Sequence, residues 1–112
     1  MVNLDKYAVY RETVRSLPGL SARDARALAW KACLGDRESR QELIERHLWL
    51  VVEMAERLHA GDALGAALLV ADGNRILVRA AETYRPWQDG DFTEYASELL
   101  VSEMGKEALP AA

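Results

Sequence analysis

The sequence has very little of what disulfides, metal sites and membrane spans require. Its 112 residues include one cysteine, Cys33, and two histidines, His47 and His59. A single cysteine cannot form an internal disulfide, and these three residues do not have the spacing of zinc ligands. No apolar run approaches the roughly 20 residues that cross a bilayer, and the N-terminus has no signal-peptide pattern. We therefore expect a cytoplasmic protein with no metal, no cofactor and no membrane partner.

Motifs that carry catalysis are missing as well. The sequence contains no glycine-rich phosphate loop and no Gly-x-Ser-x-Gly turn for a nucleophilic serine. The acidic and basic residues of 42–57 have the three- and four-residue spacing of a solvated helix face with intrahelical ion pairs. The sequence thus predicts that the chain is not an enzyme.

Negative charge is concentrated at one end of the chain. The formal net charge is −4, and residues 1–90 carry equal numbers of acidic and basic side chains. Residues 91–112 contain five acidic residues, with Lys106 as the one basic residue. Such a segment repels the phosphates of nucleic acids.

The periodicity of apolar residues predicts an all-α fold. β-branched residues are few, and no polar–apolar alternation persists along the chain. The length suits a single domain, residues 1–112, built as a compact bundle of about five helices. Residues 1–19 are expected to form an N-terminal helix (Leu4 to Ser16) and turn, and residues 108–112 a flexible tail.

Capping residues and breakers give the expected helix boundaries. Good N-caps are Ser21, Asp36, Asp62 and Asp91. Gly35 is expected to end the second helix and Gly105 the last one. We expect a break or kink near His47 in the segment from Asp36 to about Leu58, although the residue pattern alone would permit one long helix. The segment from Asp62 reaches to about Tyr84.

The apolar stripes of these helices predict the core. Residues expected inside include Leu28, Ala29, Ala32, Cys33, Leu43, Ile44, Leu48, Val51, Ala55, Leu58, Leu64, Leu68, Leu69, Ile76, Leu77, Ala80, Phe92, Tyr95, Ala96, Leu99, Leu100 and Met104. Gly73 interrupts the fourth helix at a cost of about 1 kcal/mol, which indicates close packing, an outside contact or a plain break. For Trp30, Trp49 and Trp87 we favour core packing over a role as partner-binding anchors.

Three stretches of the sequence contain short motifs in a defined order. Residues 20–61 contain a Leu-Ser opening, a Gly-Asp helix start and a Leu-Trp-Leu-Val-Val run. Residues 72–82 read Asp-Gly-Asn, then Leu, Arg-Ala and Glu, and residues 90–97 contain Gly, Phe-Thr and Tyr-Ala-Ser. Together they resemble region 2, and the short helical segment before it, of the sigma-70 family of bacterial RNA polymerase sigma factors. The resemblance covers about residues 7–104.

This resemblance implies an all-α domain that acts in transcription initiation. It implies docking on the RNA polymerase core through the clamp helices of the largest subunit, with Asp72, Asn74 and Arg79 as the candidate polymerase-binding residues. It also implies capture of the −10 promoter element as single-stranded DNA, with Phe92 and Tyr95 as the candidate DNA-binding aromatics. The alternatives are that Tyr95 is a core residue and that Asp72 and Asn74 satisfy the backbone around Gly73.

The sequence departs from this family most strongly where the family handles DNA. Glu98 and Leu99 stand where the family has two tryptophans that open the duplex, and Val101 and Ser102 replace an arginine and a glutamine. Trp49 also stands where the family has an arginine. We therefore expect promoter −10 recognition and melting to be weak or lost.

The segment that corresponds to the polymerase-docking segment of the family, residues 68–74, departs less from the family pattern. Leu68 and Ala71 replace an acidic residue and a glutamine, so docking is expected to be weakened or to have moved to another partner. The 112 residues do not extend into the helix-turn-helix domain of full-length members, so we expect either a stand-alone remnant or a fragment. The alternative function is a sigma mimic that binds an anti-sigma-type regulator or blocks polymerase without touching DNA, and the third is a helical bundle with no role in transcription.

Overall fold

A computed structural model describes residues 3–108 as six α-helices joined by short loops, with no strand among these residues. The helices are α1 (Leu4–Ser16), α2 (Ala22–Cys33), α3 (Arg37–Glu45), α4 (Leu48–Leu58), α5 (Ala63–Thr83) and α6 (Phe92–Ala108). The predicted all-α class is confirmed, with six helices where about five were expected. Residues 109–112 of the predicted tail lie outside the described residues, and Ala108 is the last residue of α6.

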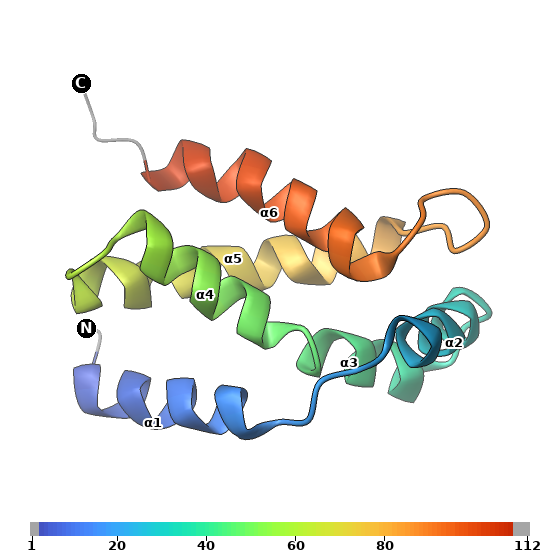
Figure 1. The fold of residues 1–112 in the computed structure, drawn as a ribbon, viewed down its shortest axis with the longest axis horizontal. Helices are drawn as coiled ribbons and strands as arrows, with labels where there is room; N and C mark the ends of the chain where they lie inside the picture. Colours follow the sequence, from blue (N-terminus) through green and yellow to red (C-terminus); the bar gives the residue numbers. More distant parts are fainter. Residues whose placement is uncertain (1–2, 109–112) are drawn as a thin grey trace.

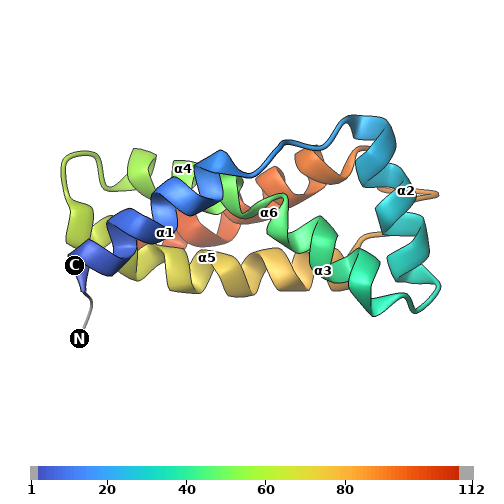
Figure 2. The ribbon, with the colours of Figure 1, turned by 90° about the horizontal axis from the view of Figure 1, so that it is seen from below.

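The centre of the molecule is formed by α4, α5 and α6, which run alongside one another (Figure 1). Helix α1 lies against α4 and α5, and α2 crosses one end of the molecule, where it packs on α3 and α6 (Figure 2). The loop 84–91 lies at the same end as α2, while the loop between α4 and α5 lies at the opposite end. The molecule is accordingly elongated, with extents of 40 × 31 × 21 Å.

Helix starts are fixed by the side chains that the sequence predicted as caps. Ser21 Oγ accepts from the backbone N–H of Asp24 at 3.0 Å, and Asp62 Oδ1 accepts from that of Gly65 at 2.9 Å. Asp36 caps α3 in the same way. Each oxygen satisfies an N–H that has no partner within its own helix, which is why these residue types favour this position.

The break between α3 and α4 is produced by His47. Its Nδ1 lies 2.8 Å from the carbonyl oxygen of Leu43, which in a continuous helix would accept the N–H of residue 47. That N–H donates instead to the carbonyl of Ile44 at 3.0 Å. The ring therefore replaces a helical hydrogen bond, and the segment becomes two helices.

Gly73 lies where side chains of α4 and α6 pack directly against the backbone of α5. A Cβ atom built there would lie 2.5 Å from Val51 Cγ1 and 2.9 Å from Met104 Sδ. Val51 and Met104 are both 0% exposed. Of the alternatives for this glycine, close packing is thus confirmed, since a side chain would push α4 and α6 away from α5.

Several residues expected in the core are exposed. They are Cys33, Leu58, Leu64 and Leu68, and their predicted burial was wrong. The buried side of α2 is formed by the alanines at 25, 29 and 32, so Cys33 at its end turns outward. Leu58 is the last residue of α4, and Leu64 and Leu68 lie one turn apart on the outward side of α5. The predicted stop at Gly105 is also wrong, because α6 continues to Ala108.

The tryptophans do not pack in the core either, contrary to the prediction. Trp30, Trp49 and Trp87 are 38%, 37% and 58% exposed. The buried core cluster consists mainly of aliphatic side chains and alanines, and its buried aromatics are Tyr84 and Phe92. Trp30 and Trp87 lie instead against each other at the α2 end, with ring centroids 5.8 Å apart.

Candidate functional site

The outward side of α5 brings together two of the three predicted polymerase-binding residues. Asp72 pairs with Arg75 on the same helix, and Arg79 pairs with Glu103 of α6. These four side chains and Ile76 line one shallow groove. Sequence reasoning missed Arg75 and Glu103, although the three-residue step from Asp72 to Arg75 is a usual spacing for a helical ion pair.

The third predicted residue, Asn74, faces another way. Its Nδ2 donates to the hydroxyl of Tyr10 on α1 at 3.1 Å, and its Oδ1 is buried with no hydrogen-bond partner in residues 3–108. Two positions along a helix differ by about 200° in direction, so Asn74 cannot share the outward side of Asp72. Its placement corrects the prediction that it belongs to the same binding face, and its observed contact is with α1.

Two exposed leucines extend the same side of α5. Leu64 and Leu68 are 49% and 53% exposed, and they precede Asp72 by eight and four residues. Residues spaced by four lie above one another on a helix surface. The outward side of α5 is therefore apolar over its first turns and carries paired charges over its later turns.

Phe92, a predicted DNA-binding residue, lies in the core. It is 1% exposed, and its ring meets His47 edge-on at a centroid distance of 4.9 Å and Tyr84 at 5.2 Å. A base stacks on an open ring face. The structure therefore contradicts the predicted role of Phe92 as a direct DNA contact, because no face of the ring is open.

Tyr95 lies at the edge of this aromatic cluster. It is partly buried, with its ring tilted against Tyr84 at 5.3 Å and its hydroxyl 2.8 Å from Thr83 Oγ1. The Tyr84 hydroxyl donates to the carbonyl of Gly90, and burial raises the pKa of Tyr84. The cluster thus holds the loop 84–91 against the first turn of α6.

His47 connects this cluster to the break between α3 and α4. Its Nε2 lies 2.8 Å from Thr93 Oγ1, and burial lowers the pKa of His47, partly opposed by the Leu43 carbonyl and by Asp91. A carbonyl only accepts hydrogen bonds, so we assign the proton of the neutral ring to Nδ1, and Nε2 accepts from Thr93. His47 is therefore a structural residue in a polar–aromatic core.

The outer side of α6 is acidic. Glu94 and Glu98 are exposed, and neither makes an ion pair with the residues that the structure describes. Glu103 is engaged by Arg79 and points toward α5. Unpaired carboxylates on this side repel a phosphate backbone.

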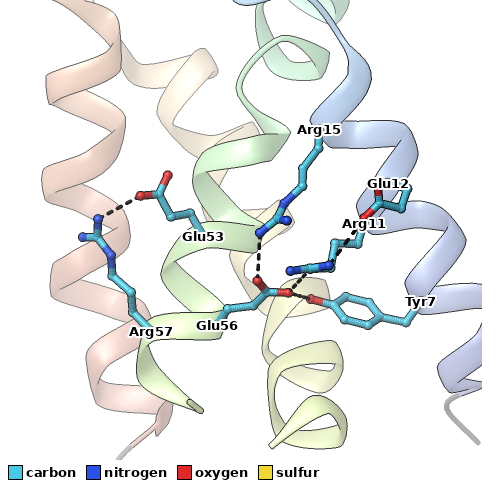
Figure 3. Close-up of polar contacts among 7 residues, drawn as sticks. All are labelled: Tyr7, Arg11, Glu12, Arg15, Glu53, Glu56 and Arg57. Atoms are coloured by element: carbon cyan, nitrogen blue, oxygen red, sulfur yellow. Dashed lines mark hydrogen bonds and ion pairs between the residues drawn. The ribbon is translucent and has the colours of Figure 1, made fainter. Parts of the chain in front are cut away.

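A polar cluster holds α1 on α4, and no sequence motif indicated it (Figure 3). The carboxylate of Glu56 accepts from the Tyr7 hydroxyl at 3.1 Å, from Arg11 Nε, and from an Arg15 guanidinium nitrogen at 3.4 Å. Burial, and then the negative charge of Glu56, raise the pKa of Tyr7 to about 12. The four-residue spacing of the three donors on α1 was a visible signal, but their partner lies more than 40 residues away.

Residues 3–108 offer neither a cluster of metal ligands nor a membrane-spanning helix. No group of three or more histidine, cysteine, aspartate or glutamate side chains is placed there to hold a metal ion. None of the described helices combines the length and the apolar character that crossing a bilayer demands.

Two curated proteins similar to this chain are RNA polymerase sigma factors, both called SigA. The one from a Bacillus species is 32% identical over 93 residues, which cover 83% of this chain and 24% of the relative. The one from Clostridium acetobutylicum is 31% identical over 93 residues, with the same shares of both chains. The chain thus spans about a quarter of the length of these relatives. No family model matches the sequence.

Proposed function

We propose that this chain, which is similar over 83% of its length to two sigma factors, acts in transcription initiation by docking on RNA polymerase through the outward side of α5. The similarity to two polymerase sigma factors supports this partner. The observation that carries the proposal is that Asp72 and Arg79 open onto one groove of that side. We propose further that promoter −10 recognition and melting are weak or lost.

The side chains of this surface suit a helical partner such as the clamp helices of the largest polymerase subunit. Leu64 and Leu68 offer apolar contact area, while Asp72, Arg75 and Arg79 offer charges of both signs. Charges that are already paired are held in defined positions, so they lose less side-chain freedom when a partner arrives. Complementary charges also fix the register of two helices that meet.

Charge reversal at Asp72 tests the docking. Purified core RNA polymerase would be titrated with the wild-type chain, with Asp72→Arg and with Glu42→Arg, a matched reversal at an exposed residue of α3. Asp72→Arg places three arginines side by side on α5 and is expected to weaken binding about tenfold or more, which corresponds to roughly 1.4 kcal/mol. Glu42→Arg is expected to bind as wild type. Equal binding by both variants, or no binding of the wild type, would contradict the proposal.

The expectation of weak DNA binding follows from α6. Burial removes Phe92 from reach, Tyr95 is partly covered, and Glu94 and Glu98 oppose phosphate. Single-stranded DNA of −10 sequence, titrated at low salt, is expected to bind far more weakly than to a SigA-type sigma factor. Tight binding that is lost in Tyr95→Ala would overturn this part of the proposal.

The exposed acids Glu94 and Glu98 of α6 favour a second candidate, a sigma mimic. A domain that keeps the α5 docking surface and repels DNA would occupy polymerase unproductively, or would bind an anti-sigma-type regulator in place of a sigma factor. In transcription reconstituted with core polymerase and a SigA-type sigma factor, added chain would then lower promoter-dependent RNA synthesis. Promoter-specific RNA made with this chain in place of the sigma factor would exclude the mimic.

A further inference from the structure

We infer that the surface of α4 and α5 beneath α1 is a docking groove for a helix of a partner protein, and that α1 occupies it as an intramolecular ligand until the partner displaces it. This surface, the α1 groove, is formed by the sides of α4 and α5 that carry Glu56 and Asn74. The partner helix carries tyrosine and arginine side chains at four-residue intervals, as α1 does. The inference is independent of polymerase docking, because Asn74 and Asp72 face different ways on α5.

Glu56 of α4 gives the α1 groove a defined ligand chemistry. Its carboxylate accepts from the Tyr7 hydroxyl at 3.1 Å, from Arg11 Nε, and from an Arg15 guanidinium nitrogen at 3.4 Å (Figure 3). The three donors follow one another at four-residue steps, so they lie along one side of α1. Two of them are cations, whose hydrogen bonds to a carboxylate are stronger than those of neutral donors. The groove therefore favours a helix with positively charged donors at this spacing.

The floor of the α1 groove is apolar beside this carboxylate. Val52 of α4 and Ala66 of α5 are each 2% exposed, and they line the hollows that border α1. From α1, Tyr10 and Val14 pack on the same core. An apolar floor beside an acidic side chain suits an amphipathic helix with basic residues. The carboxylate disfavours nucleic acid as the occupant.

The polar contact between α1 and α5 is incomplete. Asn74 Nδ2 donates to the Tyr10 hydroxyl at 3.1 Å, but Asn74 Oδ1 is buried and has no hydrogen-bond partner in residues 3–108. A buried acceptor without a partner is unfavourable, because it has lost its hydrogen bonds to water. A helix that directs a further donor at this oxygen would fit the groove better than α1 does.

Few buried side chains attach α1 to the groove. Val14 is the one buried residue of α1, whereas α4 and α5 each bury several. The side chains of Arg11 and Arg15 are 32% and 51% exposed, and solvent screens ion pairs of this kind. Hollows of about 450 and 460 Å³ border the two ends of the helix. A competing helix can therefore replace this contact.

The connection between α1 and α2 allows α1 to leave while the other helices stay in place. Leu17 has an extended backbone, and residues 17–19 are exposed. Arg46 Nη1 donates to the carbonyl of Pro18 at 2.8 Å, which fixes the chain just after α1. Rotation about the backbone at Leu17 would thus move α1 alone.

A peptide with the α1 sequence tests the groove in trans. The fluorescently labelled probe contains residues 3–18, with a hydrocarbon staple in place of the exposed Val9 and Thr13, because so short a helix is marginal in water. A matched probe has alanine in place of Arg11 and Arg15. Fluorescence anisotropy is expected to show weak binding of the first probe to the wild-type chain, since its own α1 occupies the groove, and no binding of the second.

Weakening the chain's own α1 should open the groove. Arg11→Ala/Arg15→Ala leaves α4 and α5 unchanged, and it is expected to bind the first probe at least about tenfold more tightly than wild type, because apparent affinity rises with the fraction of free grooves. Adding Glu56→Gln should remove most of this gain. The matched control Arg23→Ala/Arg37→Ala, at exposed residues of α2 and α3, is expected to bind as wild type.

Hydrogen exchange measures the displacement itself. Saturating unlabelled peptide should speed amide exchange in residues 4–16 of an isotopically labelled wild-type chain, while residues 66–81 of α5 stay protected. Thermal melting followed by circular dichroism verifies that each variant is folded.

Several results would overturn the inference. Equal probe binding by the wild type and by folded Arg11→Ala/Arg15→Ala is one, and an undiminished gain after Glu56→Gln is added is another. Probe binding without faster exchange in residues 4–16 would show that α1 is not displaced. A wild-type dimer that is lost in Glu56→Gln would assign the groove to α1 of a second copy and not to a separate partner.

Discussion

Two sets of aromatic side chains differ in their burial. At the start of α6, Phe92 packs edge-on with both His47 and Tyr84, and all three are buried. The three tryptophans, in α2, in α4 and in the loop 84–91, are each more than a third exposed. The buried group holds secondary-structure elements together, whereas exposed indoles give up burial free energy and mark surfaces open to partners.

This contrast matters for function because the buried group includes a residue that the sigma-70 resemblance assigns to DNA. Phe92 contributes to the position of α6 through its contacts with Tyr84 and His47. Large apolar side chains that are exposed to solvent lie away from Phe92, on the outward side of α5 and around Trp49. Variants at the two groups should therefore separate effects on stability from effects on binding.

The largest effect is expected for Phe92→Ala. Removal of a ring that is 1% exposed leaves a cavity beside His47 and Tyr84, which typically costs about 3–5 kcal/mol of unfolding free energy. Urea denaturation followed by circular dichroism measures this loss. A loss below about 1 kcal/mol would show that the ring is not a core residue in solution.

A smaller loss is expected when His47 becomes protonated. Its folded-state pKa is lowered from 6.5 by burial, so the unfolded chain binds a proton more readily than the folded chain does. Stability should therefore be full above about pH 6.5 and fall as the pH drops from there toward the lower folded-state pKa, with no further loss from this residue below it.

The pH dependence is checked by urea denaturation between about pH 7.5 and 5.5, a range that includes the ordinary histidine pKa of 6.5 and stays above most carboxylate titration. His47→Gln is expected to flatten the decline, and His59→Gln, which removes the other histidine, is expected to keep it. A decline of the same size in both variants would assign the pH dependence to other groups.

A still smaller loss of unfolding free energy is expected for Tyr84→Phe. This change keeps the ring in the cluster and removes only the hydrogen bond to the Gly90 carbonyl. The expected cost is about 1 kcal/mol, measured by the same denaturation. Because the bond joins the two ends of the loop 84–91, faster amide hydrogen exchange in residues 85–91 should accompany the loss, and unchanged exchange would contradict this role.

The smallest effect on stability is expected for Trp87→Ala. The ring is 58% exposed and contacts Trp30 at the surface, so its removal should change the unfolding free energy by less than about 1 kcal/mol. A loss comparable to that of Phe92→Ala would abolish the distinction between the two aromatic groups. The melting temperatures of Trp87→Ala and Phe92→Ala, measured under the same conditions, test this distinction.

The helix boundaries and caps were predictable because they depend on neighbouring residues. Ser21, Asp36 and Asp62 cap the helices that follow them, and Gly35 adopts a positive φ of 100° that favours glycine. Which residues of an apolar helix face are buried was less predictable. Burial depends on tertiary contacts with helices that are distant in the sequence. The exposure of Leu64 and Leu68 follows from the absence of a described helix over that side of α5, and no local pattern reveals this.

The candidate site was predictable only in part. Asp72 and Arg79 lie seven residues apart, which is close to two turns, so their common side follows from helix geometry. The direction of Asn74 follows from the same geometry, but its contact with Tyr10 requires the position of α1. The apolar stripe of residues 92–104 predicted Phe92 in the core, and its 1% exposure confirms this, whereas the family motif assigned the same residue to DNA.

Competition for polymerase tests the central claim most directly. Core RNA polymerase would be loaded with a labelled SigA-type sigma factor and titrated with this chain, with Asp72→Arg and with Glu42→Arg. The account predicts that the wild type and Glu42→Arg displace the sigma factor, while Asp72→Arg needs about tenfold more protein. Failure of the wild type to displace it, or equal displacement by Asp72→Arg, would contradict docking through α5.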